Sequence, residues 1–561
     1  MPRSRSRRVP RVPAALVVLT ACAPADDGPT SDVALDSPAV DAALAAVRPA
    51  AVEGHIRALA ADSLLGRAPG TPGYEGASRY VETQLRDLGL APAGEDGGFR
   101  QAVTLRESLV DASASRMTLE REGRSLPLEY GTDYYLSPDP NREDATVTAP
   151  VVFAGYGVSA PGFGYDDYEG LDVEGRIVAV LSGAPPSLPS NPRAYYSSGG
   201  VKRDEAAARG AVGLISFNAP DDPRFRWDVS VARAQRGGFA WTRGEETSAG
   251  ESPIQGSATL NSGAVEVLFA GSPVPLDSVL ARASASVPQR MELPVTATLT
   301  TRTRHRSVES HNLVARLEGS DPDLRDEHVV YVAHIDHFGV GVAVDGDSIY
   351  NGAHDNASGS AIVLEIARAF TALPAAPRRS VVFLFVTAEE WGLLGSDYWV
   401  RHPTVPQESI VANFSLDMPF LFHPLRDIVP YGADHSTLDD DVRAAAARMG
   451  LAIGPDPIPE QVLFIRSDHF SFIRQGIPAL FIKSGFETGD ERDGSAINAA
   501  WRRDVYHTPR DEADQGFDFA AGVSHAQVNF LTGYHVAMRR ARPTWKAGDF
   551  FGRIFGTPPA S

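Results

Sequence analysis

Residues 380–396 read SVVFLFVTAEEWGLLGS, in which a strongly apolar run leads directly into two adjacent glutamates. The first part, SVVFLFV, is rich in β-branched and aromatic residues, which predicts a strand buried on both faces. Glu389 and Glu390 stand just beyond the point where this strand ends. Burial and mutual repulsion both make such a pair of charges costly at the edge of an apolar sheet. The pair therefore predicts a cation close by.

The chain around this stretch alternates between strand-like and helix-like patterns. From residue 311 onward, the runs HNLVARL, HVVYVAH, SIVANFSLD and IPALFIKSG read as strands and are separated by helical patterns, with a long helix predicted over about 518–540. This alternation is typical of an α/β sandwich with a largely parallel sheet. In such sheets, functional side chains lie at the carboxyl ends of the strands.

Side chains that bind metals follow several of these predicted strands. His334 and Asp336 come at the end of HVVYVAH, Asp417 ends SIVANFSLD, Asp355 precedes a helical pattern, and His507 follows IPALFIKSG after an irregular stretch. Imidazole and carboxylate ligands without a thiolate suit zinc in a catalytic site. Taken alone, Asp355 reads more readily as a helix N-cap. The prediction of a metal site therefore depends on the coincidence of these residues at successive strand ends.

The overall composition limits the number of domains and the class of partner. The chain has 561 residues, which is too many for one core, so at least two domains are expected. The formal net charge of −19 argues against nucleic acid as a partner, because a phosphate-binding surface needs the opposite sign.

The N-terminal stretch MPRSRSRRVPRVPAALVVLTAC is typical of a secretory signal, with arginines before a short apolar run. Its end resembles a bacterial lipobox, in which Cys22, the only cysteine of the chain, is lipidated and becomes the mature N-terminus. The alternative is a plain signal peptide with an incidental cysteine, which would make the protein secreted. The lipobox implies a lipid anchor in the bacterial cell envelope that faces the periplasm, and Ala23 favours the outer membrane.

Six motifs resemble those of the co-catalytic zinc exopeptidases, the clan that includes bacterial leucyl aminopeptidases, aminopeptidase Y and glutamate carboxypeptidase. They cover most of residues 311–520 and read AHIDHFG, IYNGAHDNASG, VTAEEWGLLGS, SLDM, RSDHFSFIRQGIPALF and VYHTPRDEAD. The resemblance implies a three-layer αβα sandwich with a mostly parallel central sheet. The earlier stretch VVFAGYGVSAPGFGYDDYEGLDVEGRIVAVL resembles a β-rich protease-associated (PA) domain inserted into the chain.

These resemblances imply a division of the chain into six parts. Within it, the residue pattern of 40–62 reads as helical, and AVEVLFA, residues 264–270, reads as a short strand. The parts are the signal peptide and lipobox (1–22), a flexible tether (23–39), the N-terminal part of the peptidase domain (40–134), the PA domain (135–300), the zinc peptidase catalytic domain (301–545) and a C-terminal tail (546–561).

The resemblance also implies two zinc ions bound by five side chains. Asp355 would bridge the two ions. Glu390 and His507 would complete one site, and His334 and Asp417 the other. The Asp355–Asn356 bond matches a position where the family has a cis peptide.

The same resemblance assigns the catalytic roles. Glu389 would be the general base that takes a proton from the attacking water and gives it to the leaving amine. Asp336 would orient His334, the usual role of a carboxylate behind a metal-bound imidazole. His337, beside this cluster, is weighed for a supporting role of the same kind.

The chain departs from the family pattern in two places, and two residues keep alternative roles. His354 stands where relatives often have an acid, so it is weighed as a competing ligand. A long insertion, ETGDERDGSAINAAWRRD (487–504), is expected to border the substrate cleft. Asp468 and His469 belong to a family motif near the pocket, although Asp468 reads equally well as a helix N-cap.

The predicted function is zinc-dependent hydrolysis of peptide bonds, with release of N-terminal residues favoured. A carboxypeptidase or dipeptidase of the same clan is the alternative, because the sequence locates neither an acidic subsite for an amine nor an arginine subsite for a carboxylate. Glutaminyl cyclisation on this fold uses one zinc, whereas all five ligand positions are filled here. The intact ligand set also argues against a non-catalytic receptor built on a PA domain.

Overall fold

The computed structural model describes residues 33–220, 222 and 225–556. The predicted signal segment and lipobox, residues 1–22 with Cys22, lie outside the described residues, as does the first part of the predicted tether. None of the helices within the described ranges combines the length and the apolar character that a membrane span requires.

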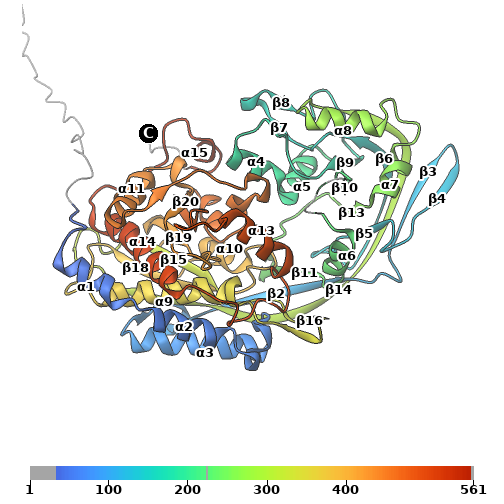
Figure 1. Ribbon diagram of the computed structural model, residues 1–561. Helices are drawn as coiled ribbons and strands as arrows, with labels where there is room; N and C mark the ends of the chain where they lie inside the picture. The colour runs from blue at the N-terminus through green and yellow to red at the C-terminus, as the bar shows by residue number, and fades with distance from the viewer. Residues whose placement is uncertain (1–32, 221, 223–224, 557–561) are drawn as a thin grey trace, which may run out of the picture.

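The centre of the molecule is a mixed sheet whose middle strands are parallel, which confirms the predicted α/β class (Figure 1). Strand β14 is antiparallel to β18, and β20 is antiparallel to β22. The four parallel strands therefore place their carboxyl ends at one edge. In spatial order, the strands are β12 (Glu246–Thr247), β11 (Gly238–Arg243), β2 (Arg100–Val110), β14 (Met291–Leu317), β18 (Ser380–Val386), β15 (His328–His334), β19 (Ile410–Ser415), β22 (Ala479–Ser484), β20 (Asp427–Tyr431) and β21 (Ala452–Ile453), and the short β1 (Ala91–Pro92) also pairs with β14.

Both faces of this sheet are buried, because successive side chains of a strand point to opposite sides. In β15, Tyr331 packs in the core beneath α9 and α14, whereas its neighbour Val332 packs with Trp399 of α10 and Phe472 of α12. The result is the three-layer arrangement implied by the family resemblance. The covering helices are α9 (Ser358–Thr371), α14 (Phe519–Met538), α10 (Leu394–Arg401) and α12 (His469–Ile473).

The predicted helix over residues 40–62 is two helices, α1 (Pro38–Ala46) and α2 (Pro49–Leu59). Proline disfavours the helical conformation in the residue before it, and it cannot donate the hydrogen bond that a helix interior requires. Arg48, which precedes Pro49, is accordingly extended, with φ −134° and ψ 141°. The pattern of apolar residues predicts helix correctly on both sides of this break.

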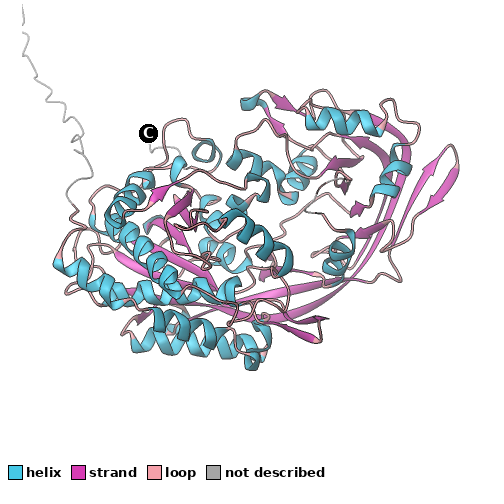
Figure 2. Ribbon diagram, in the orientation of Figure 1, coloured by secondary structure: helices cyan, strands magenta, loops and turns pink. Residues whose placement is uncertain are grey.

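A second sheet extends from the central one, and β14 passes through both (Figure 2). Strands β6, β9, β10 and β13 of this sheet are mutually parallel. Its identity as a PA domain over residues 135–300 stays a prediction, as do the other domain boundaries. In spatial order, its strands are β4 (Arg124–Pro127), β3 (Arg116–Arg121), β14, β6 (Asp144–Phe153), β9 (Ile177–Leu181), β10 (Gly213–Phe217), β13 (Ser257–Leu260) and β5 (Tyr134–Leu136).

The predicted strand AVEVLFA is wrong, because these residues form helix α7 (Ser262–Phe269). The side chain of Asn261 accepts a hydrogen bond of 2.8 Å from the backbone N–H of Ala264 and thereby caps the helix. Val265, Leu268 and Phe269 are buried at helical spacing. A short apolar run fits either a strand or a buried helix, and the cap decides between them here.

The ends of the described chain pack onto the central part of the molecule. Leu35, within the predicted tether, is buried in the core under α1. Phe551, within the predicted tail, is fully buried in the core beside α10 and α12.

The remaining helices of eight or more residues, with the short α15, are α3 (Pro72–Asp87), α4 (Ser190–Ser197), α5 (Gly199–Ala208), α6 (Trp227–Gln235), α8 (Leu276–Ser284), α11 (Leu438–Met449), α13 (Gly494–Asp504) and α15 (Phe550–Ile554). The remaining strands are β7 (Ser159–Ala160), β8 (Tyr165–Asp166), β16 (Gly339–Val344) and β17 (Asp347–Tyr350).

Candidate metal centre

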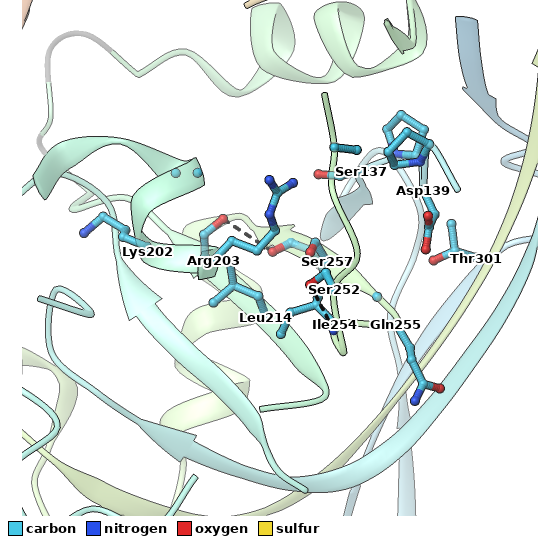
Figure 3. Close-up of a pocket in the computed structure, with 18 of the residues that line it drawn as sticks. Ser137, Asp139, Lys202, Arg203, Leu214, Ser252, Ile254, Gln255, Ser257 and Thr301 are labelled. Carbon is cyan, nitrogen blue, oxygen red and sulfur yellow. Dashed lines mark hydrogen bonds between the residues drawn. The ribbon is translucent and has the colours of Figure 1, made fainter. Parts of the chain in front are cut away.

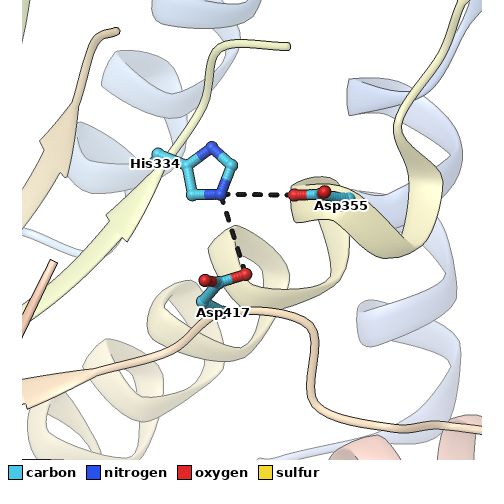
Figure 4. Close-up of side chains that lie close together, drawn as sticks. All are labelled: His334, Asp355 and Asp417. Atoms are coloured by element: carbon cyan, nitrogen blue, oxygen red, sulfur yellow. Dashed lines mark ion pairs between the residues drawn. The ribbon is translucent and has the colours of Figure 1, made fainter. Parts of the chain in front are cut away.

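Three predicted ligands meet at the carboxyl edge of the central sheet (Figure 4). His334 is the last residue of β15, Asp417 follows β19, and Asp355 lies in the short helical segment Ala353–Ala357 before α9. The Nε2 atom of His334 is 3.4 Å from Asp355 Oδ1 and 3.7 Å from Asp417 Oδ1. Within the described ranges, the buried atoms His334 Nε2 and Asp417 Oδ1 have no hydrogen-bond partner. Such orphaned atoms fit a metal ion that they would share.

The other oxygen of Asp355 faces a second group of ligands. The Nε2 atom of His507 is 3.1 Å from Asp355 Oδ2 and 3.4 Å from Glu390 Oε2. Asp355 therefore presents one oxygen to His334 and the other to His507. All five predicted ligands lie together, in two groups that share this carboxylate. The Asp355–Asn356 peptide bond is cis, as the resemblance implies.

His337 also reaches this second group. Its Nδ1 atom lies 2.5 Å from Glu390 Oε1, and the ring is fully buried. Among the described residues, His507 forms contacts within 4 Å to both Asp355 and Glu390, whereas His337 forms one only to Glu390. His337, Asp355 and Glu390 can also hold a metal together, and His337 Nε2 is buried without a hydrogen-bond partner among the described residues. The structure therefore offers two histidines to this group: His507, which is the predicted ligand and contacts both carboxylates, and His337, which contacts Glu390.

The electrostatics of the cluster also call for a cation. Burial and the charge of Asp355 raise the pKa of Glu390 to about 8, and burial raises the pKa of Glu389 well above its usual value. Burial opposes charge on Asp355 as well, but His334 and His507 hold the pKa of that carboxyl well below its usual range. The cluster thus contains more carboxylate than its histidines can neutralise. Nitrogen and oxygen donors of this kind suit zinc.

Asp336 connects the histidine to the glutamate pair. The backbone N–H groups of Glu389 and Glu390 donate to its carboxylate, at 3.2 and 3.4 Å. The Nδ1 atom of His334 is 3.2 Å from the carbonyl oxygen of Asp336 and 3.8 Å from its carboxylate. The predicted orienting contact is therefore made through the backbone oxygen, while the carboxylate holds the loop that presents both glutamates.

Two residues that the sequence did not single out support the ligand loops. Asp511 accepts hydrogen bonds from the backbone N–H groups of His354 and Asp355, at 2.8 and 2.9 Å. Arg67, which is almost fully buried, donates to the carbonyl oxygens of Ile335, Asn351 and Gly352. Both join segments that are distant in the sequence, so local patterns did not reveal them. The one signal in the sequence was that Asp511 lies within the motif VYHTPRDEAD.

We expect Asp511→Ala to weaken zinc binding by about 10–100-fold, the effect typical of removing a group that orients a metal ligand. The cause is the loss of both hydrogen bonds that fix the backbone of Asp355. Competition with a chromogenic zinc chelator measures the change. Asp514→Ala, an exposed carboxylate in the same loop, is the matched control. Equal zinc affinity in the two variants would show that Asp511 does not position the ligand.

The other residues singled out in this region have different surroundings. The ring of His354 lies 4.6 Å from that of Trp501 and also contacts Phe420 and Phe422, and burial lowers its pKa to about 3. It is therefore a neutral ring in an aromatic environment, and none of the candidate ligand groups within the described ranges includes it. Asp468 stands at the N-cap position of α12 but forms no side-chain cap hydrogen bond, so the N-cap alternative is wrong.

Two cavities differ in what they can do chemically. The larger, of about 340 Å³, lies in the second sheet and is lined by polar residues that include Asp139, Lys202 and Thr301 (Figure 3). None of the candidate metal-ligand groups among the described residues touches it. The smaller, of about 30 Å³, is lined by Asp355, Glu389, Glu390 and Asp417. The metal chemistry therefore belongs to the smaller cleft.

Known proteins resemble this chain most clearly in the region of the metal cluster. Residues 312–529 match the model of Peptidase family M28. A probable leucine aminopeptidase 2 of Aspergillus oryzae is 31% identical over 34% of this chain and 36% of its own length, and a probable glutamate carboxypeptidase of Arthroderma benhamiae is 32% identical over 34% and 27%. The chain thus spans about a third of the length of these two relatives.

Two longer similarities extend beyond this region. The probable lipoprotein aminopeptidase LpqL of Mycobacterium tuberculosis is 26% identical over 84% of this chain and 80% of its own. The solved aminopeptidase from Aneurinibacillus sp. strain AM-1 superposes with a TM-score of 0.52 at 21% identity, over 89% of this chain and 96% of its own, which shows a shared fold. Residues 312–529 of this chain therefore belong to peptidase family M28.

Proposed function

We propose that this protein is a zinc-dependent metallopeptidase that binds two zinc ions and acts as an aminopeptidase. The observation that carries the proposal is the placement of Asp355, whose two oxygens face two separate histidine–carboxylate groups, at 3.4 Å from His334 and 3.1 Å from His507. A single carboxylate between two such groups is suited to bridging a pair of metals. The relatives named as aminopeptidases support the choice of reaction.

The residues of the chain would divide the work in a simple way. One ion would be held by His334 and Asp417, the other by Glu390 and His507, and Asp355 would serve both. When bound, zinc would supply Lewis acidity that polarises the scissile carbonyl and acidifies a water. Glu389 stands beside His334, with 3.7 Å between Oε2 and Nε2, and this is the one ion pair within 4 Å that it forms among the described residues.

Glu389 is therefore proposed as the general base. It would take the proton of the attacking water and return it to the leaving amine. Burial and neighbouring carboxylates raise the pKa of its carboxyl well above the usual value, which helps it to accept a proton. Asp336 would keep the loop of Glu389 in place through the N–H groups that it binds.

A carboxypeptidase or dipeptidase remains the second candidate, because the cleft contains arginines. Arg466 and Arg502 line it beside the metal cluster. Carboxypeptidases need such groups for the terminal carboxylate of the substrate. The relative named as a glutamate carboxypeptidase fits this alternative.

The proposal for the rest of the chain follows the sequence. Lipidation of Cys22 would anchor the protein in the cell envelope, facing the periplasm, with residues 135–300 as a PA domain beside the catalytic part. The relative named as a lipoprotein aminopeptidase supports the anchor.

The test is metal analysis of the purified mature chain, combined with hydrolysis of amino-acid p-nitroanilides and dipeptides before and after chelation. We expect about two zinc ions per chain and cleavage that is lost on chelation and restored by zinc. Cleavage of dipeptides without cleavage of p-nitroanilides would favour the second candidate. A well-folded protein without stoichiometric metal would overturn the proposed enzyme.

A further inference from the structure

The wall of the metal cleft contains three cationic side chains, Arg466, Lys483 and Arg502. Within the described part of the chain, none of them forms an ion pair with a carboxylate within 4 Å; the polar contacts that they do make are to a hydroxyl, an amide or backbone carbonyls. The two guanidinium groups therefore line the cleft without a carboxylate at ion-pair distance.

The two arginines are held in position around one aromatic ring. The guanidinium of Arg466 lies 5.9 Å from the ring centroid of Tyr506 and donates to its hydroxyl at 2.9 Å. That of Arg502 lies 5.7 Å from the same centroid and donates through Nε to Asn498 at 3.1 Å. Each contact occupies one N–H of a group that has about five. Most of the donors of both arginines therefore remain available to a ligand.

Lys483 has a different role. It is 7% exposed, and its Nζ donates to the backbone carbonyls of Asp417 and Met418, at 3.0 and 2.5 Å. These bonds fix the loop that carries the ligand Asp417. Lys483 therefore supports the loop, and because burial lowers its pKa to about 7, the two arginines supply the lasting charge and the free donors.

The net charge of the cleft with two zinc ions bound indicates which charge on the substrate it would favour. The carboxylates that line the cleft are Asp355, Glu389, Glu390 and Asp417, and all four are assigned to metal binding or catalysis. Two zinc ions would neutralise them. The two arginines would then leave a positive region in the wall of the cleft. A negative group on the substrate would fit this cleft.

We propose that Arg466 and Arg502 bind a carboxylate of the substrate and make the enzyme selective for peptides that carry one next to the scissile bond. The carboxylate can be the C-terminus of a dipeptide or the side chain of an aspartate or glutamate residue. A guanidinium binds either with paired, charge-assisted hydrogen bonds. Arg502 comes from helix α13, within the insertion 487–504, so this selectivity is built by a segment that departs from the family pattern. The proposal rests on the peptidase function proposed above.

The test compares Arg502→Met with Arg503→Met, an exposed arginine one position along the same helix. The substrates form two pairs: a neutral dipeptide and its C-terminal amide, and the p-nitroanilides of glutamate and glutamine. We expect Arg502→Met to raise KM for the carboxylate member of at least one pair by about 10–100-fold and to leave the uncharged member almost unchanged. Arg502→Lys should recover part of the loss. The pair that responds identifies the source of the carboxylate.

A binding measurement separates this proposal from the proposed function. Calorimetry of the zinc-loaded protein with a dipeptide analogue, in which a methylene-amine replaces the scissile amide, should show the same dependence on Arg502 without any turnover. A wild type that prefers the carboxylate member of neither pair, or an Arg502→Met protein that matches Arg503→Met on both pairs, would overturn the carboxylate subsite. Loss of all peptide hydrolysis in the wild type would overturn the function and leave the binding result to decide the subsite.

Discussion

Glu389→Gln is expected to lower kcat for peptide hydrolysis by about 10²–10⁴-fold while the chain keeps its zinc, because glutamine can neither take nor return the proton. The side chain stays the same size, and the N–H bond from residue 389 to Asp336 is a backbone contact that the substitution leaves intact. We expect KM to change far less than kcat, since the lost interaction acts in the transition state. Steady-state kinetics and metal analysis of one preparation measure both quantities.

Glu390→Gln is the matched comparison, because the two glutamates are neighbours but face different partners. Glu390 lies 3.4 Å from His507 Nε2 and 2.5 Å from His337 Nδ1, whereas Glu389 lies 3.7 Å from His334 Nε2. Glu390→Gln should therefore reduce zinc content. The geometry also groups Glu389 with His334 and Glu390 as potential ligands. Loss of zinc from Glu389→Gln would make Glu389 a ligand and contradict its role as the base.

The features that could be predicted from the sequence are those encoded locally. A seven-residue apolar run such as SVVFLFV has few ways to be buried other than as a central strand, and residues at its carboxyl end must then lie at the sheet edge. Glu389, His334 and Asp417 came together by that rule. Two local signals were present in the sequence but were not used. Pro49 marks the break between α1 and α2, and Asn261 is a residue type that caps helices, as it does for α7.

The features that escaped prediction depend on contacts between distant segments. Arg67 binds carbonyl oxygens more than 260 residues away along the chain, at Ile335 and Gly352, and no local pattern reports such a pairing. Arg466 and Arg502 meet only through Tyr506. The motif of Arg466 was expected near the pocket and the insertion with Arg502 at the border of the cleft, but no local pattern predicts that the two guanidinium groups lie around one ring. The position of the ligands was thus accessible, whereas the groups that support them and select the substrate were not.

Asp355→Asn is expected to remove both zinc ions, and with them the metal-dependent part of the stability of the fold. The reason is that Asp355, alone among the side chains that the structure describes, lies within 4 Å of both His334 and His507, through Oδ1 and Oδ2 respectively. Asparagine offers one neutral oxygen in place of two charged ones. A metal present at about 1,000 times its Kd stabilises a protein by about 4 kcal/mol, so thermal unfolding of the wild type should respond strongly to zinc. The Asp355→Asn protein should not respond.

Variants that remove a ligand from only one of the two metal groups provide the comparison for this test. His334→Ala and His507→Ala each remove a ligand from one group, so each should lose one zinc ion and keep part of the stabilisation. Asp355→Asn keeps the backbone N–H that Asp511 binds, so its loop should remain in place without metal. Thermal unfolding with and without zinc, with metal analysis of the same samples, distinguishes the three variants. If Asp355→Asn lost only one ion, the two groups would be independent sites, and the bridging role of this carboxylate would have to be abandoned.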